Sequence, residues 1–265
     1  MGVEPTLLPE RGPKPRASAI SPRPRLPARY PPSGTATAGG RLPTVTFRGF
    51  PPSAFSFYDG LHADNSRSYW LANKSVHVES VRGPLDDLLG ELADHGPFHV
   101  FRPYNDVRFA KNKPPYKEHQ GAFGESEGGA GFYVQISAEG LMVGAGYYAM
   151  ASDQLERFRR AVDLDATGGE IERIVAALAA GGHRIGAISE LKTAPRGYPK
   201  DHPRIVLLRR KGLMAMRSWP VAKWMHTRQV VDRVRGAWDA CADMNAWLDA
   251  HVGPSTLAPE DAERW

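Results

Sequence analysis

The feature that most constrains the fold is a pair of alternating segments joined by a short turn. Within residues 131–137, apolar side chains occupy every second position, and polar or aromatic side chains fall between them. Residues 138–140, Ala-Glu-Gly, form a turn sequence, and residues 141–148 resume the same period of two. This period is typical of a strand with one buried face. The pattern predicts a hairpin, and therefore an antiparallel sheet.

Helical periodicity recurs on both sides of this hairpin. Gly83-Pro84 is expected to break the helical pattern, and the short apolar run 205–208 is ambiguous. The predicted helices cover about 53–63, from a cap at Asn65 or Ser66 through Val81, from Pro84 to about His95, 152–163, 168–180 and about 226–252. Further extended segments are predicted at 98–101, 184–188 and 213–219. Strands that cluster as hairpins indicate one α+β domain over residues 46–265, with an antiparallel sheet covered by helices.

The first 45 residues differ in composition from the rest. They hold ten prolines and seven Lys or Arg against two acids, so their net charge of +5 equals that of the whole chain. Few large apolar side chains are present to offset the chain entropy lost on folding. We expect residues 1–45 to be a disordered, solvated Pro/Arg-rich tail. The remaining domain is neutral, so its charge alone does not predict nucleic-acid binding.

Several site classes are disfavoured by what the sequence lacks. The single cysteine, Cys241, cannot form an internal disulfide or a multi-thiolate zinc site. Gly96-Pro97 interrupts the helix that would align His95 with His99, so we expect no metal and no cofactor. The sequence has neither a run of 18 apolar residues nor a secretory pattern, so we expect no membrane partner and a cytoplasmic location.

One dense polar cluster, residues 101–119, carries the main functional hypothesis. Extended geometry places Asp106 on the same side as Arg108, where its carboxylate would orient the guanidinium. Tyr116 would hydrogen-bond a substrate, and His119 would transfer a proton. The alternative is a solvated edge strand and loop. The cations that would bind a phosphate or carboxylate are Arg102, Arg108, Lys111, Lys113 and Lys117.

A second basic loop repeats the same residue types. Lys192, Arg196 and Tyr198 lie within a segment rich in cations and prolines. We expect this loop to form the opposing wall of a cleft, with Lys192 or Arg196 near Arg108. The alternative is an exposed loop whose charge aids solubility.

The first cluster resembles the signature of a conserved hypothetical protein family found in bacteria and fungi, a domain of unknown function. That signature is R-x-x-R-D-x-R-F-x-x-[D/N]-K-x-x-Y, and Asn105 replaces its second arginine. The resemblance covers about residues 50–215, including Asp64-Asn65-x-Arg67-x-x-Trp70, and implies no particular activity. The matching residues are Arg102, Asp106, Arg108, Phe109, Asn112, Lys113 and Tyr116.

These features favour a protein that binds a phosphorylated or otherwise anionic small molecule. Any catalysis would be general acid–base chemistry, because neither a metal motif nor a clear nucleophile is present; the sequence leaves open whether the protein is an enzyme. One alternative is a nucleic-acid-binding module, in which the cations meet phosphates and tyrosines stack on bases. Another is an interaction domain that docks an acidic partner protein.

Overall fold

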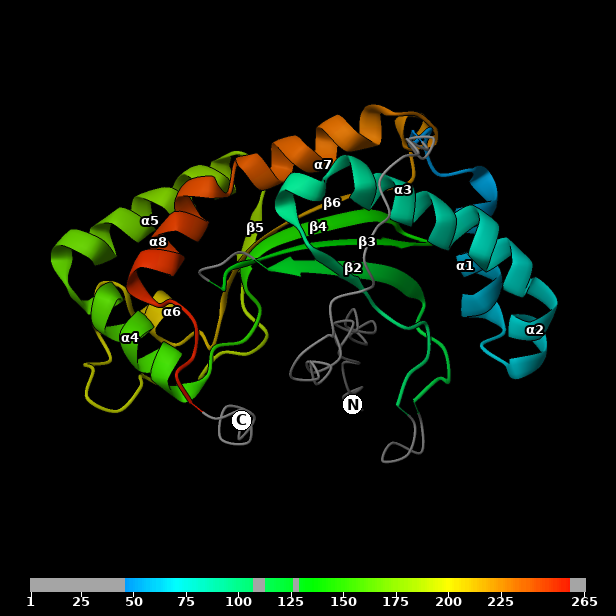
Figure 1. Cartoon of the computed structure of the whole chain (residues 1–265). Coiled ribbons are helices and arrows are strands. Elements are labelled where there is room, and N and C mark those ends of the chain that lie inside the picture. Colours follow the sequence, from blue (N-terminus) through cyan, green and yellow to red (C-terminus); the bar gives the residue numbers. More distant parts are fainter. Residues whose placement is uncertain (1–45, 107–112, 126–128, 258–265) are drawn as a thin grey trace, which may run out of the picture. The chain divides into compact units, whose positions relative to one another are not determined.

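The structure, a computed structural model, describes residues 46–106, 113–125 and 129–257, which all belong to one compact unit, Leu42–Trp265. The tail expected at residues 1–45 lies outside the described residues. Within the described unit, an antiparallel sheet has the strand order β1-β2-β3-β4-β6-β5 (Figure 1). The α+β prediction is confirmed. The strands are β1 Phe98–Val100, β2 His119–Glu125, β3 Gly131–Ser137, β4 Gly140–Tyr147, β5 Arg184–Gly186 and β6 Leu213–Trp219.

The central hairpin forms as its alternation predicts. β3 pairs with β4 in the register that sets Val134 opposite Val143, and both side chains are buried. Gly140 closes the turn with a φ of 120°, a backbone conformation that L side chains rarely adopt. A Cβ atom there would also collide with the carbonyl of Trp219. The turn therefore depends on glycine at this position.

β2 is the strand that the sequence pattern did not reveal. Its sequence, His-Gln-Gly-Ala-Phe-Gly-Glu, contains two glycines and no β-branched residue, so its intrinsic strand preference is weak. Pairing with β1 on one side and β3 on the other supplies the missing stabilisation. Tertiary context decides this element.

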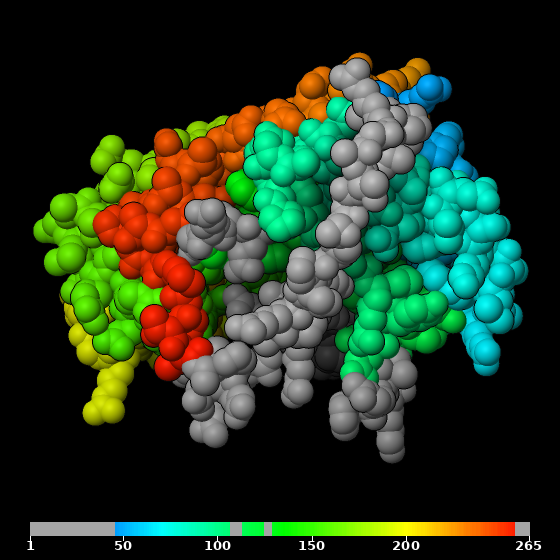
Figure 2. All heavy atoms as spheres, viewed as in Figure 1, coloured from blue at the N-terminus to red at the C-terminus, as the bar shows by residue number. Residues whose placement is uncertain are grey.

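The helices pack on one face of the sheet, which we call the front face. Side chains of Ala122, Val134 and Ala215 point to it and are fully buried beneath helices. Figure 1 shows α3 and α7 along this face, and their side chains adjoin in the space-filling view (Figure 2). The helical elements are α1 Pro52–Ala63, α2 Arg67–Val76, the π-helix η1 His77–Arg82, α3 Gly83–Glu91, the 3-10 helix η2 Ala93–His95, α4 Ser152–Asp163, α5 Asp165–Ala180, α6 Ile205–Leu208, the 3-10 helix η3 Lys223–His226, α7 Gln229–Asp239 and α8 Ala242–His251.

Two core clusters lie side by side on the front face. The first packs α1, α3 and α7 against β2, β3 and β4, with Trp238 as its largest fully buried side chain. The second packs α4, α5 and α8 against β4 and β6. Arg228 joins α7 to α3 through two bonds of 2.6 Å to the carboxylate of Glu91. Within the described ranges, no helix has the length and apolar character needed to cross a membrane.

The expected break at Gly83-Pro84 is wrong, because the helical path continues from Arg67 to Glu91. Pro84 cannot donate to the carbonyl four residues earlier, and its ring would clash there in a regular α-helix. The wider π-turn of η1 precedes it, and the amide of Gly83 bonds instead to the carbonyl of Val78. The extra residue in that turn accommodates the proline.

The helix expected over 226–252 is two helices, α7 and α8, with Ala240 and Cys241 between them. No proline marks the break. α7 contributes Trp238 to the first core cluster, whereas α8 contributes Met244 and Trp247 to the second. The apolar stripe is continuous in sequence, but its N-terminal half packs in the first core cluster and its C-terminal half in the second.

Candidate functional site

The basic cluster is part of a two-stranded arm that continues β1 and β2 beyond the sheet. We define the arm as residues 101–106 and 113–118. The amide of Lys117 donates to Pro103 O at 2.7 Å, that of Asn105 donates to Pro115 O at 2.9 Å, and Tyr104 pairs with Tyr116. Two predicted site residues, Arg108 and Lys111, lie outside the described residues, and so does the predicted bond from Asp106 to Arg108.

The arm is anchored to the loop between α1 and α2 through Tyr116. The Tyr116 ring is buried and stacks on Trp70, with centroids 4.5 Å apart and planes 9° from parallel. Asn65 completes the anchor, because its Oδ1 accepts from Tyr116 N at 3.0 Å and its Nδ2 donates to Tyr116 O at 3.0 Å. The Tyr116 ring is therefore part of the packing that holds the arm.

Asn105 has a comparable structural role. Its Nδ2 donates to Pro114 O at 2.8 Å and to Tyr116 O at 3.2 Å, so the Asn105 side chain bridges the two strands of the arm. Asn105, which replaces the second arginine of the signature, thus holds the arm together by hydrogen bonds and carries no charge.

Three of the predicted cations come together on the arm. The Lys117 Nζ atom lies over the Phe101 ring, 5.2 Å from its centroid. Burial lowers the pKa of Lys117, and repulsion from Arg102 and then Lys113 lowers it further. Among the described residues, no carboxylate forms an ion pair with any of these three cations. The arm thus carries three cations outside any described ion pair, together with two acids, Asp106 and Glu118, of which Glu118 pairs with His62.

His119 lies beside this cation cluster, as the first residue of β2. Burial lowers its pKa to about 4, and repulsion from Lys117 contributes. Glu118 opposes the shift, and its carboxylate contacts His62 Nδ1 at 3.2 Å. The imidazole of His119 is therefore uncharged at neutral pH and can donate one hydrogen bond and accept one.

The sheet surface next to the arm faces away from the helices, and we call it the rear face. On β2, β3 and β4 it carries Gly121, Tyr133, Gln135, Met142 and Gly144, which the register places in neighbouring positions. The Tyr133 ring lies 6.3 Å from that of Phe101, and its hydroxyl donates to Gln135 Oε1 at 2.7 Å. Burial raises the pKa of Tyr133 above its usual range. None of these residues is among the predicted site residues, although the polar side of the alternation in β3 contained the signal for Tyr133 and Gln135.

A buried polar pair lies behind the arm, on the front face. Gln120 donates through Nε2 to Phe101 O at 2.6 Å, which fixes the start of the arm. His77, from the π-turn, lies close to Gln120, and burial lowers the pKa of His77 to about 4. The Nε2 atom of His77 and the Oε1 atom of Gln120 have no hydrogen-bond partner of good geometry. Both side chains are buried, so the pair belongs to the core.

The second basic loop lies at the other edge of the sheet. It follows β5, whereas the arm extends from β1 and β2, and the strand order separates β1 from β5 by four strands. Lys192 and Arg196 are exposed, and Tyr198 packs partly against the second core cluster. Burial, followed by the nearby Asp163 carboxylate, raises the pKa of Tyr198. The structure brings Arg102, Lys113, Lys117 and His119 together, whereas Lys192, Arg196 and Tyr198 lie apart from them. Whether Lys192 or Arg196 lies near Arg108 falls outside the described residues.

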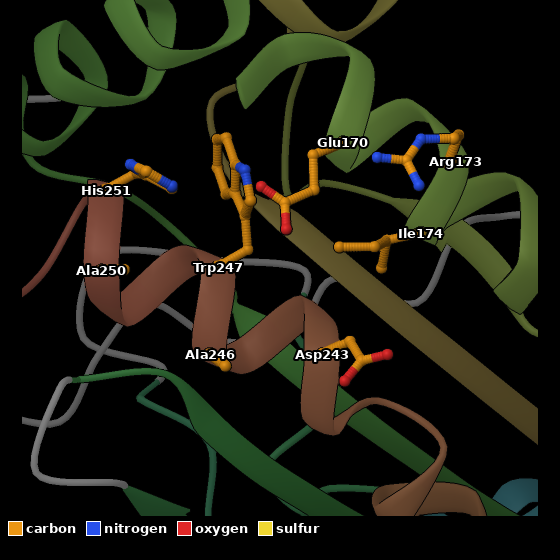
Figure 3. A pocket seen from close by; sticks show the side chains of 8 residues that line it. All are labelled: Glu170, Arg173, Ile174, Asp243, Ala246, Trp247, Ala250 and His251. Carbon is orange, nitrogen blue, oxygen red and sulfur yellow. The ribbon is translucent and has the colours of Figure 1, made fainter. Parts of the chain in front are cut away.

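A separate groove of about 470 Å³ lies between α5 and α8 (Figure 3). Its floor residue, Trp247, is buried and donates its indole N–H to Thr167 O at 3.1 Å, so it anchors the core. The charged residues Glu170, Arg173 and Asp243 at the rim are exposed. Of the predicted site residues that the structure describes, none lines the groove. Groups of three or more His, Cys, Asp or Glu that could hold a metal are likewise absent from the described residues.

Comparison with known proteins gives one family. A model described as conserved hypothetical protein (DUF2461) matches residues 53–247. This range contains the arm, its anchor at Asn65 and Trp70, and the whole sheet. No curated protein and no solved structure matches the chain.

Proposed function

As the chain belongs to DUF2461, a family of conserved hypothetical proteins, we propose its function from the site alone: it binds a small anionic molecule that carries a phosphate or a carboxylate. The observation that carries this proposal is the cation cluster of Arg102, Lys113 and Lys117. Cations gathered without a carboxylate partner repel one another, and burial adds a cost for the ammonium of Lys117. A bound anion offsets both effects.

His119 gives the proposed site its hydrogen-bonding and proton-transfer group. A bound dianion beside it would raise its pKa from about 4 back towards neutrality, because the anion stabilises the imidazolium. In that state His119 could exchange a proton with the ligand, which is the acid–base chemistry that these residues support. Tyr116 is not assigned a ligand contact, because its ring is buried against Trp70.

The test is a titration of the full chain with inorganic phosphate, followed by thermal unfolding and by the NMR signals of Lys117 and His119. Phosphate at about one hundred times its dissociation constant would stabilise the folded state by about 2.7 kcal/mol. Lys117→Met should remove this response. The matched control is Lys223→Met, which removes an exposed cation from η3, a helical segment of the front-face layer. Equal responses in both variants would refute the proposal.

Nucleic acid is the second candidate, and one observation favours it. Tyr104 on the arm is 44% exposed, and an exposed aromatic ring beside cations can stack on a base. A short single-stranded oligonucleotide would then bind more tightly than phosphate, with an affinity that falls steeply with salt. Tyr104→Ala should weaken that binding and leave phosphate binding unchanged.

A further inference from the structure

We propose that a second surface, separate from the arm, binds an acidic, extended segment of another protein. The surface joins the end of β6 to η3 and α7, and we call it the Arg–Trp row. Its members are Arg217 and Trp219 of β6, Trp224 of η3 and Arg233 of α7. The proposal does not depend on the anion site of the arm, since the two surfaces share no residue.

The four side chains form a continuous line. The Arg217 guanidinium lies over the Trp219 ring, 5.3 Å from its centroid, and the Arg233 guanidinium lies over the Trp224 ring at 4.5 Å. The two indole rings meet edge to face with centroids 5.7 Å apart. Both rings pack in part against the first core cluster, which anchors them. Contact with an anchored ring holds each guanidinium in place, so less side-chain entropy is lost when the guanidinium binds a partner.

The polar groups of the Arg–Trp row are all donors, and they have no acceptor. Among the described residues, neither guanidinium donates a hydrogen bond or forms an ion pair. Trp238 and Trp247 each donate the indole N–H to a carbonyl, at 3.2 and 3.1 Å. The indole N–H groups of Trp219 and Trp224 have no such acceptor in the described part of the chain. A partner that complements the row therefore supplies acceptors, and negatively charged ones bind guanidinium most strongly.

The surroundings of the row leave it accessible. Arg233 is exposed, and Val221 in the loop between the two tryptophans is 44% exposed. Asp232, next to Arg233 in sequence, is also exposed and forms no ion pair with it. The row thus offers two cations outside any described ion pair, together with an apolar contact, which is the complement of an acidic protein segment.

The open edge of β6 favours a partner in extended conformation. β5 pairs only with Met214–Met216, whereas β4 pairs with β6 as far as Trp219. Ser218 and Trp219 therefore have a strand neighbour on one side only. Successive residues of an antiparallel strand bond to opposite sides, so one of these two directs its N–H and C=O to the open side. No described backbone group bonds to it there, and an extended peptide can pair with it.

The length of the row sets the spacing of the acidic side chains. Its successive centres are 5.3, 5.7 and 4.5 Å apart, so the two guanidiniums are separated by no more than about 16 Å. An extended chain advances about 3.3 Å per residue, so acids four positions apart lie about 13 Å apart on one face of a strand. We therefore expect acids at alternate positions. Single-stranded nucleic acid fits less well, because guanidiniums already cover a face of each ring on which a base would stack.

The experiment titrates the full chain with two ten-residue peptides, one that alternates glutamate with threonine and one that alternates glutamine with threonine. The glutamate peptide should bind at least about tenfold more tightly, because hydrogen bonds to charged groups are the stronger ones. In NMR spectra it should shift the indole N–H signals of Trp219 and Trp224. The signal of Trp238, whose N–H already bonds to a carbonyl, should stay in place.

Three variants locate the binding surface. Arg217→Gln combined with Arg233→Gln should weaken binding of the glutamate peptide at least about tenfold. The matched control is Arg173→Gln, which removes an exposed arginine of α5 that has no ion pair among the described residues, and it should bind as the wild type does. Lys117→Met should also retain peptide binding, which separates the row from the anion site of the arm.

Several outcomes would overturn the proposal. Equal binding of the two peptides would remove the need for acidic groups, and unchanged binding in the double variant would place the peptide elsewhere. Loss of binding in Lys117→Met alone would assign the peptide to the arm. A ten-nucleotide single strand of deoxythymidine that binds more tightly than the glutamate peptide, and only when both arginines are present, would assign the row to nucleic acid. Thermal unfolding of each variant shows whether it folds, and the indole signals of the wild type decide the matter if it does not.

Discussion

The anchor at Asn65 gives a sharp test of how the arm is held. Replacing Asn65 by alanine removes two hydrogen bonds of 3.0 Å to the backbone of Tyr116 and leaves a partly buried amide without its acceptor. At about 1 kcal/mol for each bond, unfolding should become easier by about 2 kcal/mol. For a domain of this size, that corresponds to a fall in Tm of about 4–8 °C. Urea unfolding followed by tryptophan fluorescence measures the loss, and amide exchange at Tyr116 locates it.

Asn73→Ala is the control for this prediction. Asn73 also donates through its side chain, to Tyr69 O at 2.9 Å, but the bond lies within α2 and holds no distant segment. Alanine is the better helix former, so the change in stability should be close to zero. If Asn65→Ala were no more destabilising than Asn73→Ala, or if the exchange of the Tyr116 amide stayed unchanged, the arm would not depend on Asn65.

Three further predictions follow from buried polar groups. Burial lowers the pKa values of His77 and His119 from an ordinary 6.5 to about 4 in the folded state, so between these values the unfolded state binds more protons, and stability should be lost as pH falls from about 6.5 to about 4. His119→Gln should therefore reduce the slope of unfolding free energy against pH in this range by about one proton. An unchanged slope would contradict this. Arg204 is buried and donates to Val162 O at 2.6 Å and to Asp163 O at 2.8 Å. Arg204→Met should therefore lower the free energy of unfolding, measured in urea, by about 3 kcal/mol. The control Arg160→Ala breaks only an exposed pair with Glu156 and should cost less than about 0.5 kcal/mol. Burial raises the pKa of Cys241 to about 12, so its alkylation at pH 8 should proceed only as fast as unfolding exposes it, and rapid labelling of the native protein would show that the thiol is accessible.

The arm links stability to the proposed function. Asn65, Trp70 and Tyr116 pack together, and the residue after Tyr116 is Lys117, whose ammonium is held where it is partly desolvated. The stacking and backbone hydrogen bonds of Tyr116 thus hold Lys117 where burial and nearby cations disfavour its charge. Lys117→Met should consequently make the protein more stable at neutral pH while it removes anion binding, a pairing that a purely structural lysine would not show.

Elements with strong local patterns were predictable from the sequence. The alternation of residues 131–137 gave β3 correctly, because a strand with one buried face requires a period of two. The cap at Ser66 formed as expected, with its hydroxyl accepting from Tyr69 N at 3.1 Å. Such features depend on contacts between near neighbours in sequence, so composition and spacing carry the information.

The tertiary structure decided what distant segments do to one another. β2 forms because its neighbours pair with it, and the C-terminal stripe divides into α7 and α8 because its halves meet different core clusters. In the site, the sequence by itself identified the cations of the arm, because charged residues that lie close together in the sequence can be recognised without the structure. It could not show that Tyr116 is buried against Trp70, that Lys192 lies at the other edge of the sheet from the arm, or that Gly144 lies beside Tyr133. Those relations join residues far apart in the chain, and only the pairing of strands and the packing of side chains fixes them.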